Sequence, residues 1–464
     1  MNAAGVATVH FLREVPMTVT SPAAARTTMA PAVTAQVVAG AVIAANLLVV
    51  EYLFLTGGAG KNTVLTVAKF FGLHAALVMM IQLLLVARLP WLDRRLGMDR
   101  LTAWHRWVGF TLLWTVVTHA TLIVVGYATL YQMSIFATYA SLAGVTASLL
   151  GMCAAAVIVG VGVSSVRYAR RRLPYEVWHA VHLGLYAAVA LGLAHQMLEG
   201  TTFTATPAAT VYWWTLWTLV LGSLVMGRFV LPMWRNARHR FRVAAVVPES
   251  GSAVSVYVTG RHLDKLPARA GQFCIWRFPD HNGWWQANPF SLSAAPAGRH
   301  ALRLTAKAVG TTSAGLRDLR VGGRVFVEGP YGAFTSLSQR TGGTLLVAGG
   351  IGVTPIRALL EESRWGTAVV LYRVSSPADA PLLGELQELA RLRGAVLHVL
   401  AGRSRGVPPV RPFEPANLAA LVPDIRYRDV YVCGPSAMTE AVVRSARALG
   451  VPRAQVHAER FGLG

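Results

Sequence analysis

Six long apolar segments in the first half of the chain constrain its fold more than any other feature. They run over about residues 32–55, 63–87, 103–127, 142–166, 175–198 and 211–233. Each is long enough for a helix that crosses the hydrocarbon core of a bilayer, which takes about 20 residues. Only 14% of the residues are charged, whereas soluble domains carry about 25%. The sequence therefore predicts a bundle of six transmembrane helices over residues 31–234.

Arginines in the loops predict the orientation of this bundle. Loops 88–100, 167–172 and 235–242 and the N-terminal tail hold fourteen arginines, whereas loops 56–62, 128–141 and 199–210 hold one basic residue, Lys61. Loops rich in Lys and Arg stay in the cytoplasm. We therefore expect a plasma-membrane protein with both termini cytoplasmic, and residues 1–30 as a flexible tail rather than a cleaved signal peptide. Topology then explains the net charge of +22 without a nucleic acid partner.

Four histidines lie at two matched depths in two of the expected helices. His105 and His119 fall in the third segment, His182 and His195 fall in the fifth, and both segments run outward from the cytoplasm. Ionisable side chains at membrane depth are costly, so they are candidates for a functional role. Two imidazoles that face each other across a helical bundle can hold haem iron from both sides. The pattern therefore predicts two six-coordinate haems suited to electron transfer.

The spacing of these histidines predicts an irregular fifth helix. The fourteen residues between the histidines of the third segment return to the same helix face within about 40°. The thirteen residues between those of the fifth segment miss that face by about 140°. The fifth helix must therefore bend, or its histidines must approach their ligands from different sides. Two further histidines, His74 and His179, are expected to make ordinary helix–helix contacts.

The sequence after Arg242 consists of short β-rich runs separated by turns, which predicts a small antiparallel barrel over residues 235–340. It contains the turn Asn288-Pro289-Phe290-Ser291 and, later, Gly310-Thr311-Thr312-Ser313 at the start of a helix. A helix start with free N–H groups and hydroxyls attracts phosphate. Either motif, taken alone, is more often an ordinary turn or helix cap.

Residues 341–464 alternate strands and helices, as a doubly wound parallel sheet does. Gly349, Gly350 and Gly352 follow a buried strand and let backbone amides approach a pyrophosphate, although their spacing differs from the usual dinucleotide fingerprint. The arginines expected at or just after strand ends are Arg373, Arg403 and Arg405. Guanidinium groups at that edge can grip an adenosine 2′-phosphate, which favours NADPH over NADH, and solvated loop charges are the alternative.

In this order, the motifs resemble the ferric reductase and NADPH oxidase superfamily. The likeness is strongest to bacterial members that fuse a six-helix haem domain to a ferredoxin-reductase-like module, and it covers about residues 35–464. The resemblance implies two b-type haems, FAD and NADPH as cofactors. It implies that His105 and His182 hold the inner haem and that His119 and His195 hold the outer haem.

The resemblance also assigns roles in the soluble half. Phe290 would pack on the flavin ring and Ser291 would bond near its N5. Asn288 replaces a basic or imidazole residue of relatives, which removes a charged contact to the FAD pyrophosphate. The residues that would compensate are Lys307, Gly310, Thr312 and Ser313. The residues that match the nicotinamide-nucleotide segments are Gly349, Gly350, Gly352, Thr354, Pro355, Cys433, Gly434 and Pro435. Phe461 matches a late aromatic over the flavin that must move to admit nicotinamide.

The function that the resemblance implies is electron transfer from cytoplasmic NADPH, through FAD and two haems, to an acceptor on the outer face. The acceptor would be oxygen, giving superoxide, or a ferric or cupric ion or chelate. Two alternatives stay open. One is a membrane-anchored cytoplasmic NAD(P)H-flavin reductase whose helices serve as an anchor or haem scaffold. The other is a helical transporter or haem-binding sensor with a regulatory nucleotide-binding domain.

Overall fold

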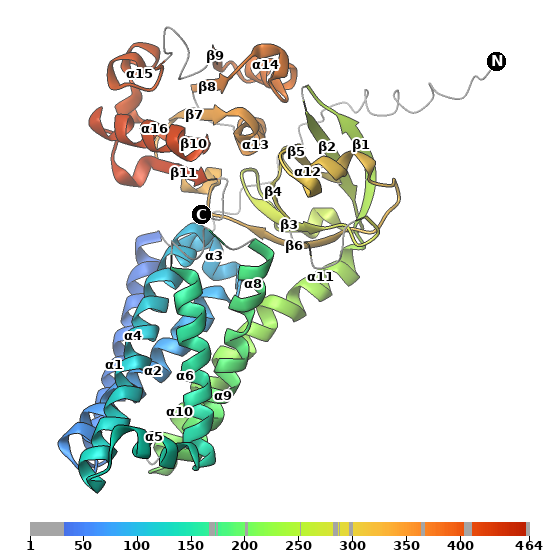
Figure 1. Cartoon of the computed structure of the whole chain (residues 1–464). Coiled ribbons are helices and arrows are strands. Elements are labelled where there is room, and N and C mark those ends of the chain that lie inside the picture. Colours follow the sequence, from blue (N-terminus) through green and yellow to red (C-terminus); the bar gives the residue numbers. More distant parts are fainter. Residues whose placement is uncertain are drawn as a thin grey trace.

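A bundle of helices carries two β-containing domains at one end (Figure 1). The structure is a computed structural model, and it describes residues 32–166, 172, 175–199, 203–250, 252–281, 286, 288–296, 300–362, 367–402 and 411–460. The helical bundle is the N-terminal half, the antiparallel β-domain follows, and the α/β domain ends the chain. The order of these units is the one that the sequence predicts.

Six helices are long and apolar enough to cross a membrane, which confirms the predicted bundle. They are α1 (Ala32–Thr56), α2 (Thr63–Val86), α4 (Met98–Tyr131), α6 (Thr146–Ser165), the pair α8 (Tyr175–Leu183) and α9 (Leu185–Glu199), and α10 (Pro207–Val225). The last helix continues through a π-helical turn (Met226–Val230) into α11 (Leu231–His239), which leads into the β-domain (Figure 1). Two short helices that the sequence did not predict, α3 (Pro90–Leu96) and α5 (Ile135–Ala143), lie in the connections.

The fifth span is broken at Gly184. Helix α8 ends at Leu183 and α9 begins at Leu185. The amide of Gly184 bonds to the carbonyl of Val181, three residues back, at 3.0 Å, instead of the carbonyl four residues back. A tighter turn of this kind rotates the two halves of a helix relative to each other. The fifth helix is thus irregular between its two histidines, as their spacing requires.

The β-domain consists of two three-stranded antiparallel sheets, in the orders β1-β2-β5 and β4-β3-β6. The strands are β1 (Arg242–Pro248), β2 (Ala253–Thr259), β3 (Phe273–Arg277), β4 (Asn288–Ser291), β5 (Ala301–Lys307) and β6 (Phe326–Tyr331). Isolated bridges from Arg242 to Arg324 and from Leu292 to Leu304 connect the two sheets. Their inner faces share a core that includes Trp276 and Phe278. The antiparallel arrangement is as expected, and the bridges link the two sheets around this core.

The α/β domain is a five-stranded parallel sheet in the order β11-β10-β7-β8-β9. Its strands are β7 (Gly343–Gly349), β8 (Ala368–Val374), β9 (Val396–Ala401), β10 (Arg428–Gly434) and β11 (Val456–Arg460), and its helices are α13 (Val353–Glu362), α14 (Leu383–Arg393), α15 (Pro415–Leu421) and α16 (Ser436–Ala448). Separate apolar cores cover the two faces of the sheet. This is the doubly wound architecture that the sequence predicts, and its strand order reverses between β7 and β10, where such sheets bind ligands.

Strand β6 docks the β-domain on the helical bundle. The side chain of Asn236, on α11, accepts a hydrogen bond from the amide of Val327 at 2.9 Å and donates one to its carbonyl at 2.8 Å. Asp93, on α3, is 1% exposed and accepts a hydrogen bond from the amide of Gly332 at 2.7 Å. Polar side chains that replace strand partners in this way fix the register between the two units.

A buried carboxylate reinforces this junction. Glu328, on β6, is 3% exposed and pairs with Arg88 of the bundle and with Arg277 of β3, the latter at 3.0 Å. Burial alone would raise the pKa of Glu328, but the charges and hydrogen bonds of Arg88 and Arg277 more than offset burial and hold the pKa below its ordinary value. Glu328 is therefore an ionised group that couples the bundle to the β-domain.

Candidate functional site

The outer pair of histidines is held by backbone carbonyls. His119 on α4 and His195 on α9 face each other, with ring centroids 6.5 Å apart and ring planes at 60°. The Nδ1 atoms lie 2.8 Å from the carbonyl oxygens of Ala68 and Ala147, respectively. Because a carbonyl only accepts, each Nδ1 carries the proton and each Nε2 keeps a free lone pair. Both rings are therefore in the tautomer that a metal ion requires.

Two glycines make room for the outer pair. A Cβ added to Gly72 on α2 would lie 2.8 Å from a ring atom of His119, and one added to Gly151 on α6 would lie 2.8 Å from a ring atom of His195. Contacts this short do not occur for real Cβ atoms. Each glycine therefore lets a histidine ring lie directly against the neighbouring helix and reach its carbonyl.

The inner pair has a different environment. His105 on α4 and His182 on α8 have ring centroids 6.1 Å apart and planes at 66°. Their Nδ1 atoms are buried and have no hydrogen-bond partner among the described residues. Nε2 of His105 lies 3.3 Å from Nε2 of Gln82, and the ring of Trp178 lies 5.0 Å from that of His182. The inner rings are thus set by side chains, without the backbone carbonyls that fix the outer rings.

Both pairs have the spacing of two imidazoles on one metal ion. Since a metal–imidazole bond is about 2.0–2.1 Å long and the ring centroid lies roughly 1 Å beyond the nitrogen, two opposed ligands place their centroids about 6 Å apart. The observed 6.1 and 6.5 Å match this value. Fourteen helical residues separate His105 from His119, so the two levels lie about 20 Å apart along α4. The residues present fit two haem irons stacked across the membrane.

The flavin strand predicted from sequence is β4. Asn288, Pro289, Phe290 and Ser291 pair with β3, and Ser291 is 4% exposed. The amide Nδ2 of Asn288 is buried and has no hydrogen-bond partner among the described residues. A buried orphan donor is costly unless a ligand satisfies it. The position that departs from relatives therefore still offers a donor that fits a bound polar group.

The predicted phosphate-binding loop uses some of its polar groups in hydrogen bonds within its own turn. The hydroxyl of Ser313 accepts hydrogen bonds from the amides of Val309 and Gly310 at 3.0 and 3.1 Å, and so caps α12 (Thr311–Gly315) from within. Lys307 is exposed at the end of β5. The side chain of Thr312 lies outside the described residues. Because the amide of Gly310 already donates to Ser313, the exposed Lys307 is the predicted residue that stays available to a phosphate here.

The two predicted nucleotide segments meet at the sheet edge between β7 and β10. A Cβ on Gly352 would lie 2.3 Å from the carbonyl oxygen of Cys433, and one on Gly434 would lie 3.0 Å from the Cα of Gly349. Gly350 has a φ of 54°, which favours glycine. These glycines let the loops before α13 and α16 touch. Two predicted residues, Thr354 and Pro355, are buried in the first turn of α13, and Pro435 leads into α16.

Arg373 is the one described member of the predicted arginine cluster. It pairs in register with Gly349 at the end of β8, and its Nη1 donates to the carbonyl of Leu400 at 3.0 Å. Its Nη2 is buried with no partner among the described residues, and burial lowers the pKa of Arg373. An unsatisfied guanidinium nitrogen beside the glycine loop suits a phosphate oxygen. Arg403, Arg405 and Phe461 lie outside the described residues.

Comparison with known proteins separates the same two halves. Residues 71–193 match the family described as ferric reductase like transmembrane component. The chain combines a ferric reductase-like transmembrane domain with a ferredoxin-reductase-like FAD/NAD module. The matched residues include His105, His119 and His182 and both glycines that make room for the outer pair, and they end two residues before His195.

The module resembles reductase components of several enzymes. The chain is 27% identical over 245 residues to the glycine betaine monooxygenase reductase subunit of Chromohalobacter salexigens, which covers 49% of this chain and 66% of that protein. It is 32% identical over 246 residues to the flavohemoprotein of Chromobacterium violaceum, which covers 48% and 60%. Among solved structures, the FAD/NAD-binding domain of nitric oxide dioxygenase from Vibrio cholerae aligns over 48% of this chain and 98% of that domain, with 24% identity and a TM-score of 0.40. The chain spans less than two thirds of the length of these curated relatives.

A charge network with two buried arginines joins the two parts of the reductase module, and its members cannot be recognised from the sequence. Arg303 on β5 donates to Glu385 on α14 at 2.8 Å and to the carbonyl of Ser293 at 2.7 Å. Arg357 on α13 donates to Glu385 at 2.8 Å and to the same carbonyl at 3.2 Å. Burial alone would raise the pKa of Glu385, but Arg303 and Arg357 more than offset it and lower the pKa. Ser293 follows the flavin strand directly, so this network fixes that strand against the nucleotide-binding helices.

Proposed function

We propose that the protein is a transmembrane oxidoreductase that passes electrons from cytoplasmic NADPH, through FAD and two bis-histidine haems, to an acceptor on the outer face. The observation that carries this proposal is the presence of two facing histidine pairs, with centroids 6.1 and 6.5 Å apart, in a domain that docks directly on a reductase module. Flavin, when bound, exchanges electron pairs with nicotinamide and single electrons with haem. A chain of such groups across the bilayer needs no moving part in the membrane domain.

The chain's own residues position the electron donor. The touching loops at Gly349–Gly352 and Cys433–Pro435 leave backbone amides and little side chain at the edge where a nicotinamide nucleotide binds. Arg373 offers a buried guanidinium nitrogen at the same edge. Together with Arg403 and Arg405 it would grip the 2′-phosphate that distinguishes NADPH from NADH. Phe461 would cover the flavin until nicotinamide displaces it.

The histidine pairs determine how the acceptor is reduced. An iron with an imidazole on each side has no open position, so the acceptor would receive electrons at the haem edge and would not bind the metal. Oxygen, giving superoxide, and ferric or cupric ions are the acceptors that suit this arrangement. Because NADPH and its protons stay on the cytoplasmic side, turnover would separate charge across the membrane.

The experiment that tests the proposal counts haem in the purified protein. We expect two haems and one FAD per chain, and we expect His182→Ala to lose about half of the haem and to stop NADPH from reducing the remainder, because the inner iron loses an axial ligand. His179→Ala, three residues away on the same helix, is the matched control and should keep both haems. Full haem content in His182→Ala would contradict the assignment. NADPH-dependent dye reduction by a protein without haem would favour the membrane-anchored flavin reductase instead.

A further inference from the structure

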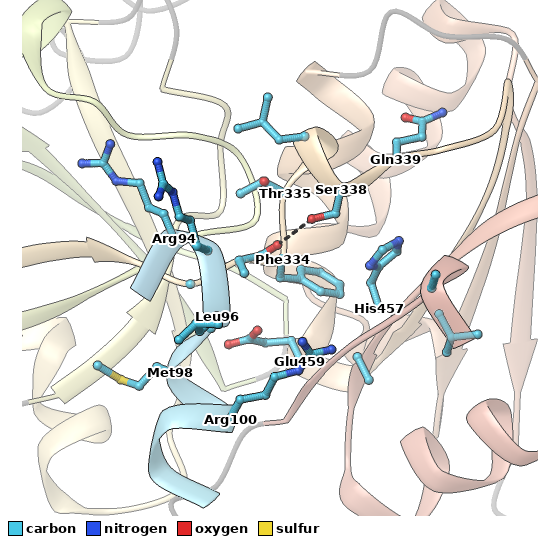
Figure 2. Close-up of a pocket in the computed structure, with 18 of the residues that line it drawn as sticks. Arg94, Leu96, Met98, Arg100, Phe334, Thr335, Ser338, Gln339, His457 and Glu459 are labelled. Carbon is cyan, nitrogen blue, oxygen red and sulfur yellow. Dashed lines mark hydrogen bonds between the residues drawn. The ribbon is translucent and has the colours of Figure 1, made fainter. Parts of the chain in front are cut away.

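A cavity of about 570 Å³ lies where all three structural units meet, and it borders the flavin strand through Phe273, the register partner of Ser291. Its walls come from the α3–α4 connection of the membrane domain, from the segment after β6 and from β11 (Figure 2). None of the described flavin or nucleotide residues, such as Ser291, Gly310 or Gly350, lines it. The residues in its walls are therefore a different set from those assigned to FAD and NADPH.

The lining of this cavity is strongly basic. The arginines in its walls are Arg94, Arg95, Arg100, Arg340 and Arg453. None of them makes an ion pair or a side-chain hydrogen bond with a described residue. Nε of Arg94 is buried and has no partner among the described residues. Arg94 is half-buried and the other four are exposed. Five guanidinium groups around one cavity repel each other and attract an anion.

The remaining lining suits an amphipathic anion. Leu96, Met98 and Phe334 line the cavity beside the arginines, and Figure 2 shows Arg94, Leu96 and Phe334 around the same space. The only described acidic side chain in the wall is Glu459. Arg100 opens the third membrane span, so the cavity lies at the level where lipid headgroups begin. Guanidinium groups bind phosphate through paired hydrogen bonds, and anionic leaflets attract such clusters.

We propose that this cavity binds a phosphate group, carried by the headgroup of an anionic phospholipid or by a small soluble phosphate, and that the bound phosphate holds the reductase module on the membrane domain. The bundle contributes Arg94, Arg95 and Arg100, and the module contributes Arg340 and Arg453. Without an anion, the arginines of the bundle repel those of the module. An anion bound between them attracts both sets. This inference goes beyond the proposed function and does not depend on haem or electron transfer.

The test measures ligand binding to the full-length, FAD-loaded protein in neutral detergent. The probes are short-chain phosphatidylglycerol, inorganic phosphate and, as the zwitterionic reference, short-chain phosphatidylcholine. We expect binding of an anionic probe to weaken about fivefold for each arginine removed, in Arg94→Gln/Arg100→Gln and, from the other wall, in Arg340→Gln/Arg453→Gln. The matched control is Arg447→Gln, an exposed arginine on α16 outside the cavity.

The outcomes distinguish a lipid from a soluble phosphate as the ligand, or show that the cavity is not a phosphate site. Tight binding of phosphatidylglycerol that inorganic phosphate does not displace would identify a lipid, whereas equal competition by phosphate would identify a soluble ligand. Wild-type affinity in both double variants would overturn the proposal. Loss of FAD from a folded double variant would also overturn it, because the cavity would then belong to the flavin site. Haem content and electron transfer are separate readouts, so failure of the proposed function leaves this result standing.

Discussion

The two histidine pairs have the same spacing but are held in different ways. In the outer pair, each Nδ1 bonds to a backbone carbonyl at 2.8 Å, and a glycine brings each ring against the neighbouring helix. In the inner pair, both Nδ1 atoms lack a described partner and the neighbours are the side chains of Gln82 and Trp178. Backbone carbonyls move only with their helices, whereas side chains rotate. The outer site is therefore preorganised by the bundle, and the inner site, next to the reductase module, is adjustable.

The largest effect that distinguishes the sites is expected from removing an outer ligand. His119→Ala should lower affinity for the outer haem at least about 100-fold, since even loss of a supporting partner of a metal ligand costs 10–100-fold. The inner haem should stay bound and reducible by NADPH, because its ligands belong to the other level. Haem content and the reduced spectrum measure both effects. If His119→Ala lost the inner haem as well, the two levels would not be independent.

The glycines provide the next test of preorganisation. Gly151→Ala should weaken the outer haem roughly 10-fold or more, because the new Cβ would lie 2.8 Å from the ring of His195 and push it off its carbonyl. Gly160→Ala is the matched control on the same helix, where a Cβ meets nothing within 4 Å. Haem titration of both variants gives the affinities. Equal affinities in the two variants would mean that the outer ring is not fixed by close packing.

Weakening the junction should affect the inner site alone. Glu328→Gln should destabilise docking by about 2 kcal/mol, less than the 3–5 kcal/mol of a fully buried pair, because Arg88 and Arg277 are 23% and 21% exposed and regain water. Electron flow from FAD to the inner haem should slow, while the haem content of the outer site is unchanged. Stopped-flow reduction and thermal unfolding measure these effects.

Docking of the β-domain on the bundle should weaken at acidic pH, because it depends on the ionised carboxylate of Glu328. The pKa of Glu328 is lowered by its arginines, so the carboxylate stabilises docking at every pH above its ordinary value of about 4.3. This stabilisation is lost as the pH falls through the lowered pKa. Wild-type docking should thus be constant from neutral pH to about pH 5 and weaken below about pH 4. An advantage of the wild type over Glu328→Gln that already disappears near neutral pH would contradict this account.

The smallest effect is expected at Gln82. Gln82→Leu should leave affinity for the inner haem within about twofold, because the amide contacts an adjustable ring and the expected gain from a neutral hydrogen bond is about 1 kcal/mol or less. The optical spectrum of the inner haem should shift, since its ligand loses a polar neighbour. A loss of haem as large as that in Gly151→Ala would show that the inner ring is as rigidly held as the outer one.

The sequence predicted the membrane half well because the bilayer restricts what residues can do there. Apolar length determines the spans, and histidines at membrane depth stand out by chemistry alone. The carbonyls of Ala68 and Ala147 left no sign, because every residue carries one, and Gly72 and Gly151 are recognisable only once the helices are packed. The short helices α3 and α5 were missed because their seven and nine residues lack a clear apolar period.

The reductase module was harder to predict below the level of its fold. Alternating strands and helices gave the parallel sheet, and the glycine loops fell where expected. Arg303, Arg357 and Glu385 are ordinary charges in the sequence, and only the docking of the two parts of the module brings them together and buries the two arginines. The hydroxyl of Ser313 caps its own helix, a use that competes with ligand binding and that spacing alone does not distinguish.

Electron transfer across an intact bilayer tests the central claim most directly. The protein is reconstituted in sealed vesicles that entrap an impermeant ferric chelate, and NADPH is added outside, where it reaches only outward-facing reductase modules. The account predicts that the entrapped iron is reduced and that His119→Ala abolishes this reduction. Reduction of an external dye by NADPH while the entrapped iron stays oxidised in the wild type would contradict it.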